Sequence, residues 1–450
     1  MFWEVFHLQI KEFLNSVCEQ IKYKPIREDI SAELKNHIEE TKEAYIENGM
    51  SSEEAEEKAV FQMGDAIEIG KNLNRIHKPK LDKTLLILTI IPLIFGLLVA
   101  YIRNDSTAIN LTENSFLKFI VILIIGLGLG IGIYFINYKK ILKYSNLFFC
   151  FATVLMLICF WTGNTINGKA YYLNLGILNF SVPTVVMPIY VISFIGFLEK
   201  MYEENKFSLE VNGLKINLNL IKIYVATGIS LAVMMEASLV NFTILTITYL
   251  ILFSVKLLQK KKFIMLIVTW IILLIILFSC ILLYFYAGGF ISNRVIGSFL
   301  PETDPQGSGW LGINQNKIIN TAKPFGKAEN MSDALKLFEE GTNYAFISIL
   351  ANYGWVVALF MVTAVILLNI KLIINSLKIK DFYGKMLIIG FSSMFIIQSL
   401  FNILMNLNIG LKVNINLPLV SYGGTELIVN IAIISLILAI YRRKDILVKE

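Results

Sequence analysis

Long apolar runs dominate the chain after residue 83, and each is about the length of a helix that crosses a membrane. Such a helix needs roughly 20 mostly apolar residues to span the hydrocarbon layer. The ten candidate spans are residues 84–102, 116–137, 146–161, 181–198, 219–235, 239–257, 263–286, 344–369, 383–406 and 424–441. Composition agrees, because 56% of the residues are apolar and 16% are charged, against roughly 45–50% and 25% in soluble domains. We therefore predict an all-α polytopic membrane protein with about ten transmembrane helices.

The distribution of lysine and arginine predicts which way the chain crosses the membrane. With the segment before the first span inside, the inner loops hold these positive charges: Lys139, Lys140, Lys143, Lys200, Lys206, Lys215, Lys260, Lys261, Lys262, Lys371, Lys378, Lys380, Arg442, Arg443 and Lys444. The short outer loops then hold only Arg103, Lys169 and Lys412. Loops rich in lysine and arginine stay on the cytoplasmic side. We therefore expect a multi-pass protein of the cell (plasma) membrane whose N- and C-termini are both cytoplasmic.

Charge is divided unevenly between the segment before the first span and the rest of the chain. Residues 1–83 carry 12 Lys/Arg and 17 Asp/Glu, a net charge of −5. The remaining residues carry 28 Lys/Arg and 17 Asp/Glu, a net charge of +11. We assign the positive surplus of the second part to membrane orientation and expect no nucleic-acid partner. The first apolar span begins only after residue 83, which argues against a cleavable signal peptide.

The N-terminal segment, 1–80, is predicted to form a separate cytoplasmic helical domain. Apolar residues recur at helical spacing through Phe2–Ile21, and a second helix is expected from Pro25 to Gly49. Two further helices are expected after pairs with capping-box spacing, Ser51 with Glu54 and Asp65 with Glu68. The run ELKNHIEETKEAYIENGMSSEEAEEKAVFQMGDAIEIGKNLNRIHKPK resembles a helical prefix domain that precedes permeases, chiefly in Gram-positive bacteria. This resemblance implies interaction or regulation rather than chemistry.

Cysteine and histidine do not predict a metal site. The four cysteines are Cys18, Cys150, Cys159 and Cys280, of which the last three lie in apolar runs. The three histidines are His7, His37 and His77, all in the N-terminal domain. We therefore expect no disulfide framework and no zinc spacing, and no cofactor is evident from the residues.

One predicted outer loop, residues 287–343, is much longer than the others. It holds most of the ionisable groups expected outside: Arg294, Glu302, Asp304, Asp333, Glu339 and Glu340. Loops this long are more often functional than structural. We therefore expect the function of the protein to face the outside.

The stretch LPLVSYGGTE, from Leu417 to Glu426, separates the last two apolar runs. Pro418 lacks an N–H, and Gly423 and Gly424 permit backbone conformations closed to other residues. At a membrane boundary, such an irregular polar loop is tolerated where it lines a cavity or packs inside the protein. The alternative is an ordinary turn between two helices.

The C-terminal third of the chain resembles the SEDS family, the FtsW, RodA and SpoVE proteins of bacterial shape, elongation, division and sporulation. Its members carry the pattern that here reads Gln398, Asn402, Leu417-Pro418 and Ser421-Tyr422-Gly423-Gly424. The run FEEGTNYAFISILANYGW also resembles a family motif, through Glu339, Thr342, Phe346 and Gly354. Residues 167–184, NGKAYYLNLGILNFSVPT, resemble a third motif more weakly. The resemblance covers about residues 84–445, with residues 287–343 as the family's large extracellular loop.

This resemblance implies an enzyme of peptidoglycan biosynthesis in cell division or cell shape. Family members act as inverting glycosyltransferases that join lipid II disaccharides outside the membrane, and a class B penicillin-binding protein is the usual partner. The implied partners are thus a lipid-linked peptidoglycan precursor, that protein and membrane lipids. The chemistry needs a carboxylate base for the attacking hydroxyl, and a positive group or divalent cation near the departing diphosphate.

The chain departs from the family at its acids. Asn343 stands where the family has an Asp, and an amide has no proton-accepting function at physiological pH. Losing a positioned base costs roughly 10²–10⁴-fold in rate. Glu339 and Glu340 are the candidate replacements, the alternative being a solvated face of a loop helix. The departure leaves reduced or lost activity open.

The remaining candidate residues are assigned to substrate binding. They are Arg294, Thr342, Gln398, Asn402, Ser421, Tyr422, Gly423 and Gly424. Arg294 suits a diphosphate, although an arginine at the end of a span also commonly extends to the membrane surface. Gln398 and Asn402 lie one helical turn apart, and buried amides in membranes often hold helices together instead.

Three alternatives to an active polymerase remain open. The first is a non-catalytic relative that binds a cell-wall synthase or a lipid-linked precursor as a scaffold. The second is a transporter, or flippase, of a lipid-linked precursor. The third is an unrelated permease, which the spaced set of Gln398, Asn402 and Ser421–Gly424 does not support.

Overall fold

The apolar runs form helices because, in a hydrocarbon layer, each backbone N–H and C=O must find its hydrogen-bond partner within the protein. The computed structural model describes residues 2–76, 78–106, 115–166, 169–175, 178–202, 208–211, 214–271, 275, 295–328 and 342–444. Within these ranges, nine helices are long and apolar enough to cross a membrane. They are α5 (Lys83–Ser106), α6 (Ser115–Phe135), α8 (Ser145–Thr162), α9 (Val182–Glu199), α10 (Leu218–Ala237), α11 (Leu239–Gln259), α17 (Trp355–Leu377), α18 (Phe382–Asn406) and α19 (Gly424–Arg442). The prediction of an all-α polytopic membrane protein is confirmed.

Two of the ten predicted spans do not coincide with a single described helix. The predicted span 263–286 is helical over 263–271, and nearly all of its remainder lies outside the described residues. The predicted span 344–369 is wrong as a single helix, because the chain forms a short helix α16 (Ala345–Tyr353) followed by the longer α17.

The break between α16 and α17 falls at Gly354. This glycine has φ +88, and a Cβ there would lie 2.6 Å from the Lys323 carbonyl oxygen and 2.8 Å from that of Pro324. These two carbonyls accept hydrogen bonds from the N–H groups of Trp355 (3.0 Å) and Val356 (3.1 Å). The approaching segment thus satisfies the first donors of α17, which an uninterrupted helix would bond internally. A segment distant in the sequence therefore causes the break.

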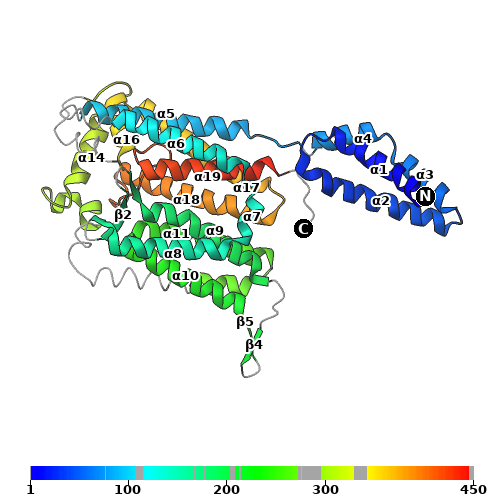
Figure 1. Ribbon diagram of the computed structural model, residues 1–450. Helices are drawn as coiled ribbons and strands as arrows, with labels where there is room; N and C mark the ends of the chain where they lie inside the picture. Colours follow the sequence, from blue (N-terminus) through cyan, green and yellow to red (C-terminus); the bar gives the residue numbers. More distant parts are fainter. Residues whose placement is uncertain are drawn as a thin grey trace. The chain divides into compact units, whose positions relative to one another are not determined.

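The helices of the membrane unit lie side by side, and small residues allow close approach (Figure 1). α18 packs against α9, α11 and α17, and α17 packs against α5. α6 meets α19 at two glycines, since a Cβ on Gly126 would lie 2.9 Å from Ile431 and one on Gly130 would lie 2.5 Å from Ser435. Small residues at these positions let two helix backbones approach each other. The two glycines therefore bring α6 close to α19.

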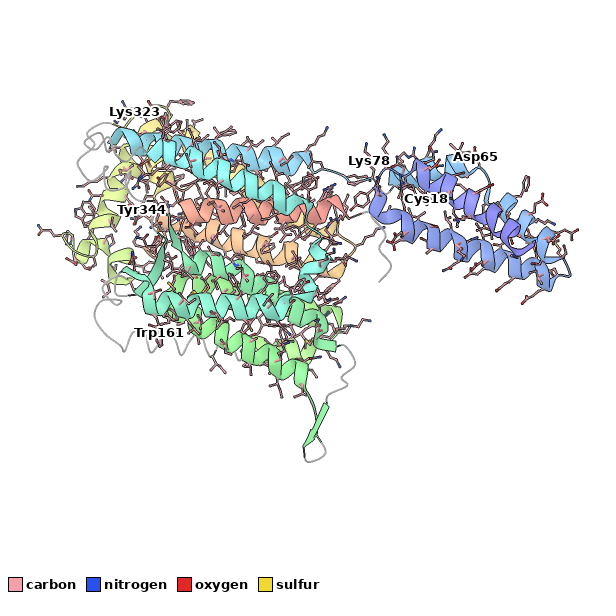
Figure 2. The ribbon with its side chains drawn as sticks, viewed as in Figure 1. Cys18, Asp65, Lys78, Trp161, Lys323 and Tyr344 are labelled. Atoms are coloured by element: carbon pink, nitrogen blue, oxygen red, sulfur yellow. The ribbon has the colours of Figure 1, made fainter. Side chains whose placement is uncertain are left out.

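Short elements gather at the two ends of this bundle (Figure 1). At one end lie β1 (Asn164–Ile166), β2 (Lys169–Leu175), β3 (Leu178–Ser181), η3 (Pro301–Thr303), α14 (Trp310–Thr321) and α16. At the other end lie α7 (Tyr138–Lys143), η2 (Lys200–Tyr202), β4 (Ser208–Val211) and β5 (Leu214–Asn217). Trp161, Lys323 and Tyr344 all lie at the first end (Figure 2). Trp161 is 89% exposed there, as is usual for tryptophan at a membrane–water boundary.

The antiparallel β1–β2–β3 sheet was not part of the sequence prediction. Its strands pair in sequence order, with Tyr172 opposite Ser181. The sheet returns the chain to the start of α9. There the backbone N–H of Ser181 donates to Thr425 Oγ1 at 3.1 Å. The sheet is therefore tied to the first turn of α19.

The loop before α19 is part of an apolar core at the same end. Leu417, Leu419 and Val420 are all at most 2% exposed, and Leu417 and Val420 pack with residues of α5, α14, α16 and α17. α5 approaches closely at Gly96, where a Cβ would lie 2.8 Å from the Leu419 carbonyl oxygen. An irregular segment at this depth is tolerated because it is buried in protein.

A second compact unit comprises Met1–Asp82 and Ile440–Glu450. Its helices are α1 (Phe2–Gln20), η1 (Lys24–Ile26), α2 (Arg27–Glu47), α3 (Ser52–Met63) and α4 (Ala66–Ile76). The capping box of Ser51 and Glu54 is present at α3, and Asp65 accepts from the Ile67 N–H at 2.8 Å. Val17, Ile21 and Ile38 are fully buried in its core. The predicted helices of this unit are therefore present, with the first turn of the second helix formed as a 3₁₀ helix.

Candidate functional site

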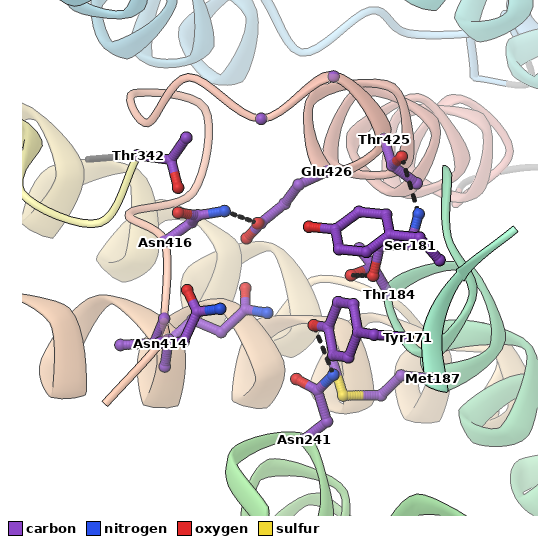
Figure 3. Close-up of a pocket in the computed structure, with 15 residues that line it drawn as sticks. Tyr171, Ser181, Thr184, Met187, Asn241, Thr342, Asn414, Asn416, Thr425 and Glu426 are labelled. Atoms are coloured by element: carbon purple, nitrogen blue, oxygen red, sulfur yellow. Dashed lines mark hydrogen bonds between the residues drawn. The ribbon is translucent and has the colours of Figure 1, made fainter. Parts of the chain in front are cut away.

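A polar pocket with a volume of about 150 Å³ lies within the membrane unit, at the end that holds β2 (Figure 3). Its lining residues are Tyr171, Tyr172, Ser181, Thr184, Met187, Asn241, Thr342, Gln398, Asn414, Ile415, Asn416, Gly423, Gly424, Thr425 and Glu426. They come from β2, β3, α9, α11, α18, the α18–α19 loop and the first turn of α19, with Thr342 from the turn before α16. Most carry hydroxyl or amide groups, which are suited to hydrogen-bonding a polar ligand.

The pocket brings four of the predicted site residues together. Thr342, Gln398, Gly423 and Gly424 all line it, although they lie in three separate parts of the sequence. These residues of the family pattern, which are far apart in the sequence, therefore meet at one place in the fold. Arg294, Glu339 and Glu340, by contrast, lie outside the described residues.

Asn402 lies behind the pocket, where it holds three segments together. It is fully buried, and its Nδ2 donates to the carbonyl oxygens of Asn343 (2.9 Å) and Ile415 (2.7 Å). Asn406, one turn later, donates to the same Asn343 carbonyl at 3.0 Å. The two amides thus attach the 342–343 turn and the α18–α19 loop to α18. This is the helix-joining role expected for buried amides in a membrane protein.

The Asn343 side chain is half-buried beside Thr342, whose hydroxyl donates to Asn343 Oδ1 at 3.3 Å. Thr342 lines the pocket and Asn343 is not among the lining residues. Position 343 therefore follows a pocket-lining residue, and its carbonyl oxygen is held by the amides of Asn402 and Asn406. A neutral amide at that position binds hydrogen-bond partners and accepts no proton.

Ser421 and Tyr422 shape the loop rather than line the pocket. Ser421 Oγ accepts from the Leu417 N–H at 2.8 Å, and the Ser421 N–H donates to the Leu417 carbonyl at 3.0 Å. Leu419, inside this turn, has φ +65. Tyr422 stacks on Phe119 with ring centroids 6.2 Å apart, and the Arg103 guanidinium lies 4.9 Å from its ring centre. These contacts fix the direction in which α19 begins.

Glu426 extends from the first turn of α19 into the pocket and faces Asn416 (Figure 3). Asn416 Nδ2 donates a short hydrogen bond to Glu426 Oε2. The Oδ1 atom of Asn416 is buried and has no hydrogen-bond partner within the part of the chain that the structure describes. No role was predicted for Glu426 from the sequence. A carboxylate two residues after the Ser-Tyr-Gly-Gly motif, in the first turn of a helix, is the signal that could have identified it.

Two adjacent tyrosines of β2, Tyr171 and Tyr172, line the pocket. Their rings are tilted against each other with centroids 5.1 Å apart, and the Tyr171 hydroxyl accepts from Asn241 Nδ2 at 3.4 Å. Burial, and then the proximity of Tyr171 and Glu426, raise the pKa of the Tyr172 phenol above its ordinary value. Tyr172 therefore stays protonated at neutral pH and offers a hydrogen-bond donor to a ligand.

The described residues that line the pocket do not by themselves supply the ligands that a divalent cation prefers. Among the residues that the structure describes, no three His, Cys, Asp or Glu side chains gather at one place, and the lining has one carboxylate, Glu426. Hard divalent cations prefer about six or more oxygen ligands, of which carboxylates are the strongest. We therefore assign no resident metal to these residues.

Comparisons with known proteins agree with this fold. The family model described as the FtsW, RodA and SpoVE cell cycle protein matches residues 81–446. No curated protein matched the sequence in a direct comparison.

Solved structures resemble the chain in fold. One, described as showing structural coordination of polymerization and crosslinking by a peptidoglycan synthase complex, has 18% identity and a TM-score of 0.63, covering 81% of this chain and 98% of its own. The rod shape determining protein RodA of Thermus thermophilus has 18% identity and a TM-score of 0.55, with 81% and 97% covered. An aspartate-to-alanine variant of that RodA has 17% identity and a TM-score of 0.56, with 81% and 98% covered.

The family match spans most of the chain, and the residues of the family pattern that line the pocket converge as described above. At identities of 17–18%, the solved structures add the shared fold. The chain belongs to the FtsW, RodA and SpoVE family of cell cycle proteins.

Proposed function

We propose that the protein is a peptidoglycan glycosyltransferase, which polymerises lipid-linked disaccharides at the outer face of the cell membrane. The observation that supports this most is the pocket itself. Motif residues Thr342, Gln398, Gly423 and Gly424 meet there around a polar cavity that contains the Glu426 carboxylate. Amides and hydroxyls match the hydroxyl groups of a sugar in hydrogen-bonding capacity. The lipid part of the substrate remains in the surrounding bilayer.

The proposed orientation places the pocket outside and both termini in the cytoplasm. It is supported by the opposite end of the bundle, where α7 carries Lys139, Lys140 and Lys143. Lysine-rich loops stay on the cytoplasmic side. A cysteine-labelling experiment tests this arrangement, since a membrane-impermeant thiol reagent should label a cysteine placed at Lys323 in intact cells and fail to label one placed at Lys140.

We further propose that a class B penicillin-binding protein cross-links the glycan that this chain makes. Support comes from the similar structure described in terms of both polymerization and crosslinking by a synthase complex. Co-purification of the tagged chain from its own membranes, followed by labelling with a fluorescent β-lactam, tests this partner. A labelled protein that co-elutes with the wild-type chain supports the proposal.

The second candidate is a non-catalytic protein that binds the same precursor as a scaffold. It is favoured by Asn343 at the position of the family's acid, and by the use of its carbonyl as an anchor for Asn402 and Asn406. Binding with no turnover is what this candidate predicts.

The decisive experiment incubates the purified full-length protein with fluorescent lipid II, with and without MgCl₂, and separates the products on a gel. Glycan chains that depend on the protein support the glycosyltransferase. Saturable binding without any chain formation supports the scaffold instead. Gln398→Ala is the pocket variant, because it removes an amide from the lining, and it should weaken both binding and polymerisation. Glu302→Gln is the control, since Glu302 is exposed and does not line the pocket.

A further inference from the structure

We propose that Glu426 is the proton acceptor of this pocket, and thus replaces the acid that the chain lacks at position 343. The inference rests on the proposed glycosyltransferase function and adds a catalytic residue to it. Three observations support it: the position of the carboxylate, the way in which it is held, and its relation to the 342–343 turn.

The first observation is position. Among the described residues that line the pocket, Glu426 is the one carboxylate. It faces the same space as Thr342 and Tyr171 (Figure 3). The pocket therefore contains the chemical group that the reaction needs, supplied by the first turn of α19. A carboxylate can act as the base for the attacking hydroxyl only if it lies within hydrogen-bond reach of that hydroxyl.

The second observation is the way in which the carboxylate is held. Asn416 Nδ2 donates to one oxygen, Oε2. The other oxygen, Oε1, accepts no hydrogen bond from a described residue. One oxygen is thus fixed by the protein, and the second is available to a substrate hydroxyl. This is how a general base is oriented, since the hydrogen bond that fixes it leaves its proton-accepting lone pair unused.

The third observation concerns the 342–343 turn. Asn402 and Asn406 hold the carbonyl of Asn343, and Thr342 next to it lines the pocket together with Glu426. The position of the family's acid therefore directly follows a residue that shares this cavity with Glu426. A carboxylate at 426 thus serves the cavity beside which the family carries its acid.

The chemical step follows from this placement. The acceptor sugar hydroxyl gives its proton to Glu426 while its oxygen forms a bond to the anomeric carbon of the donor sugar. The bond from that carbon to the diphosphate oxygen breaks, and the electron pair leaves with the lipid diphosphate. Protonated Glu426 then releases its proton to water. No oxidant, reductant or further reactant is needed.

A purely structural role for Glu426 is the alternative, because an acidic residue in the first turn of a helix stabilises that helix. Glu426→Gln separates the two roles. The glutamine has nearly the same shape, and its Oε1 still accepts from Asn416, but an amide accepts no proton. The matched control is Glu302→Gln, the same change at an exposed position outside the pocket.

The test measures the rate of glycan polymerisation, the affinity for fluorescent lipid II and the thermal unfolding midpoint of each purified variant. We expect Glu426→Gln to lose about 10²–10⁴-fold in rate, the usual effect of removing a positioned base, with affinity and unfolding midpoint close to wild type. Glu302→Gln should match wild type in all three. A Glu426→Gln protein that polymerises within about threefold of wild type overturns the assignment and leaves the glycosyltransferase function intact. An inactive wild type refutes both.

A double variant provides a second readout. Asn343→Asp combined with Glu426→Gln returns a carboxylate to the position that it has in the family while removing the one on α19. If Glu426 acts as a base, the double variant polymerises faster than Glu426→Gln alone. A folded double variant that is no faster than the single variant means that the loss came from the shape of the pocket, and overturns the proposal.

Discussion

Removing the Asn402 amide should destabilise the fold far more than removing a comparable buried amide elsewhere. Asn402→Ala deletes two donated hydrogen bonds, to the carbonyls of Asn343 and Ile415. Asn406 Nδ2 also donates to Asn402 Oδ1, but it keeps its two carbonyl acceptors in the variant. Each of the two deleted hydrogen bonds is worth about 1 kcal/mol net. The Ile415 carbonyl also loses its donor inside the protein, which adds about 1–3 kcal/mol. We therefore expect a loss of about 3–5 kcal/mol in the free energy of unfolding.

The matched control is Asn314→Ala. Asn314 is also buried, but its Nδ2 donates at 2.9 Å to Trp310, one turn earlier in the same helix α14. Loss of that local hydrogen bond should cost about 1 kcal/mol. Both variants are unfolded by titration with SDS from the same detergent micelles, and lipid II polymerisation is measured in parallel. Polymerisation should fall with Asn402→Ala, because Ile415 and the turn before α16 border the pocket.

A difference of less than about 1 kcal/mol between the two variants, which is no larger than a single net hydrogen bond, would refute the joining role of Asn402. Asn402 would then contribute no more than a local amide does. A normal polymerisation rate in a clearly destabilised Asn402→Ala protein would refute the link between this amide and the pocket while leaving its structural role.

Three further predictions concern the same end of the bundle. Gly354→Ala should lower the free energy of unfolding by more than the roughly 1–2 kcal/mol cost of a left-handed backbone, because the new Cβ also meets two backbone carbonyls. The control is Gly228→Ala, which has open space around the new Cβ and should not lower the free energy of unfolding in the same titration. Burial lowers the pKa of Lys412 to about 8, so between that value and its ordinary one near 10.4 the folded chain binds fewer protons than the unfolded chain. The unfolding midpoint of wild type should therefore rise relative to that of Lys412→Met between pH 7 and pH 10, and parallel midpoints would contradict this burial effect. Asn416→Ala should lower the polymerisation rate without abolishing it, since it leaves the Glu426 carboxylate but removes the hydrogen bond that orients it; an unchanged rate would show that this hydrogen bond has no part in catalysis.

Local patterns were sufficient to predict most of the helices. Nine of the predicted apolar spans correspond to described membrane-length helices. One of them, 344–369, was predicted to start too early, because α17 begins only at Trp355. The helices of the N-terminal unit also follow their local signals, such as the capping box at Ser51. These features depend on residues within a few positions of each other, because apolar length and cap hydrogen bonds are local quantities.

Local patterns did not predict backbone conformations that depend on a segment distant in the sequence. The helix break at Gly354 depends on the carbonyls of Lys323 and Pro324, and the small sheet of β1–β3 ends against Thr425 of α19. The polar motif residues were recognisable in the sequence, but their division into lining and anchoring residues was not. Gln398 lines the pocket, whereas Asn402, one helical turn later, holds the segments behind it.

The amino-acid sequence by itself determined that this chain crosses a membrane repeatedly as helices, and that it carries the residue pattern of its family. Those properties follow from hydrophobic length and from residue spacing, which need no knowledge of neighbours in space. Only the tertiary structure decided which of the described side chains share the pocket and that the Glu426 carboxylate is among them. A side chain enters a cavity because of the packing of several helices, and that packing depends on contacts between residues far apart in the chain.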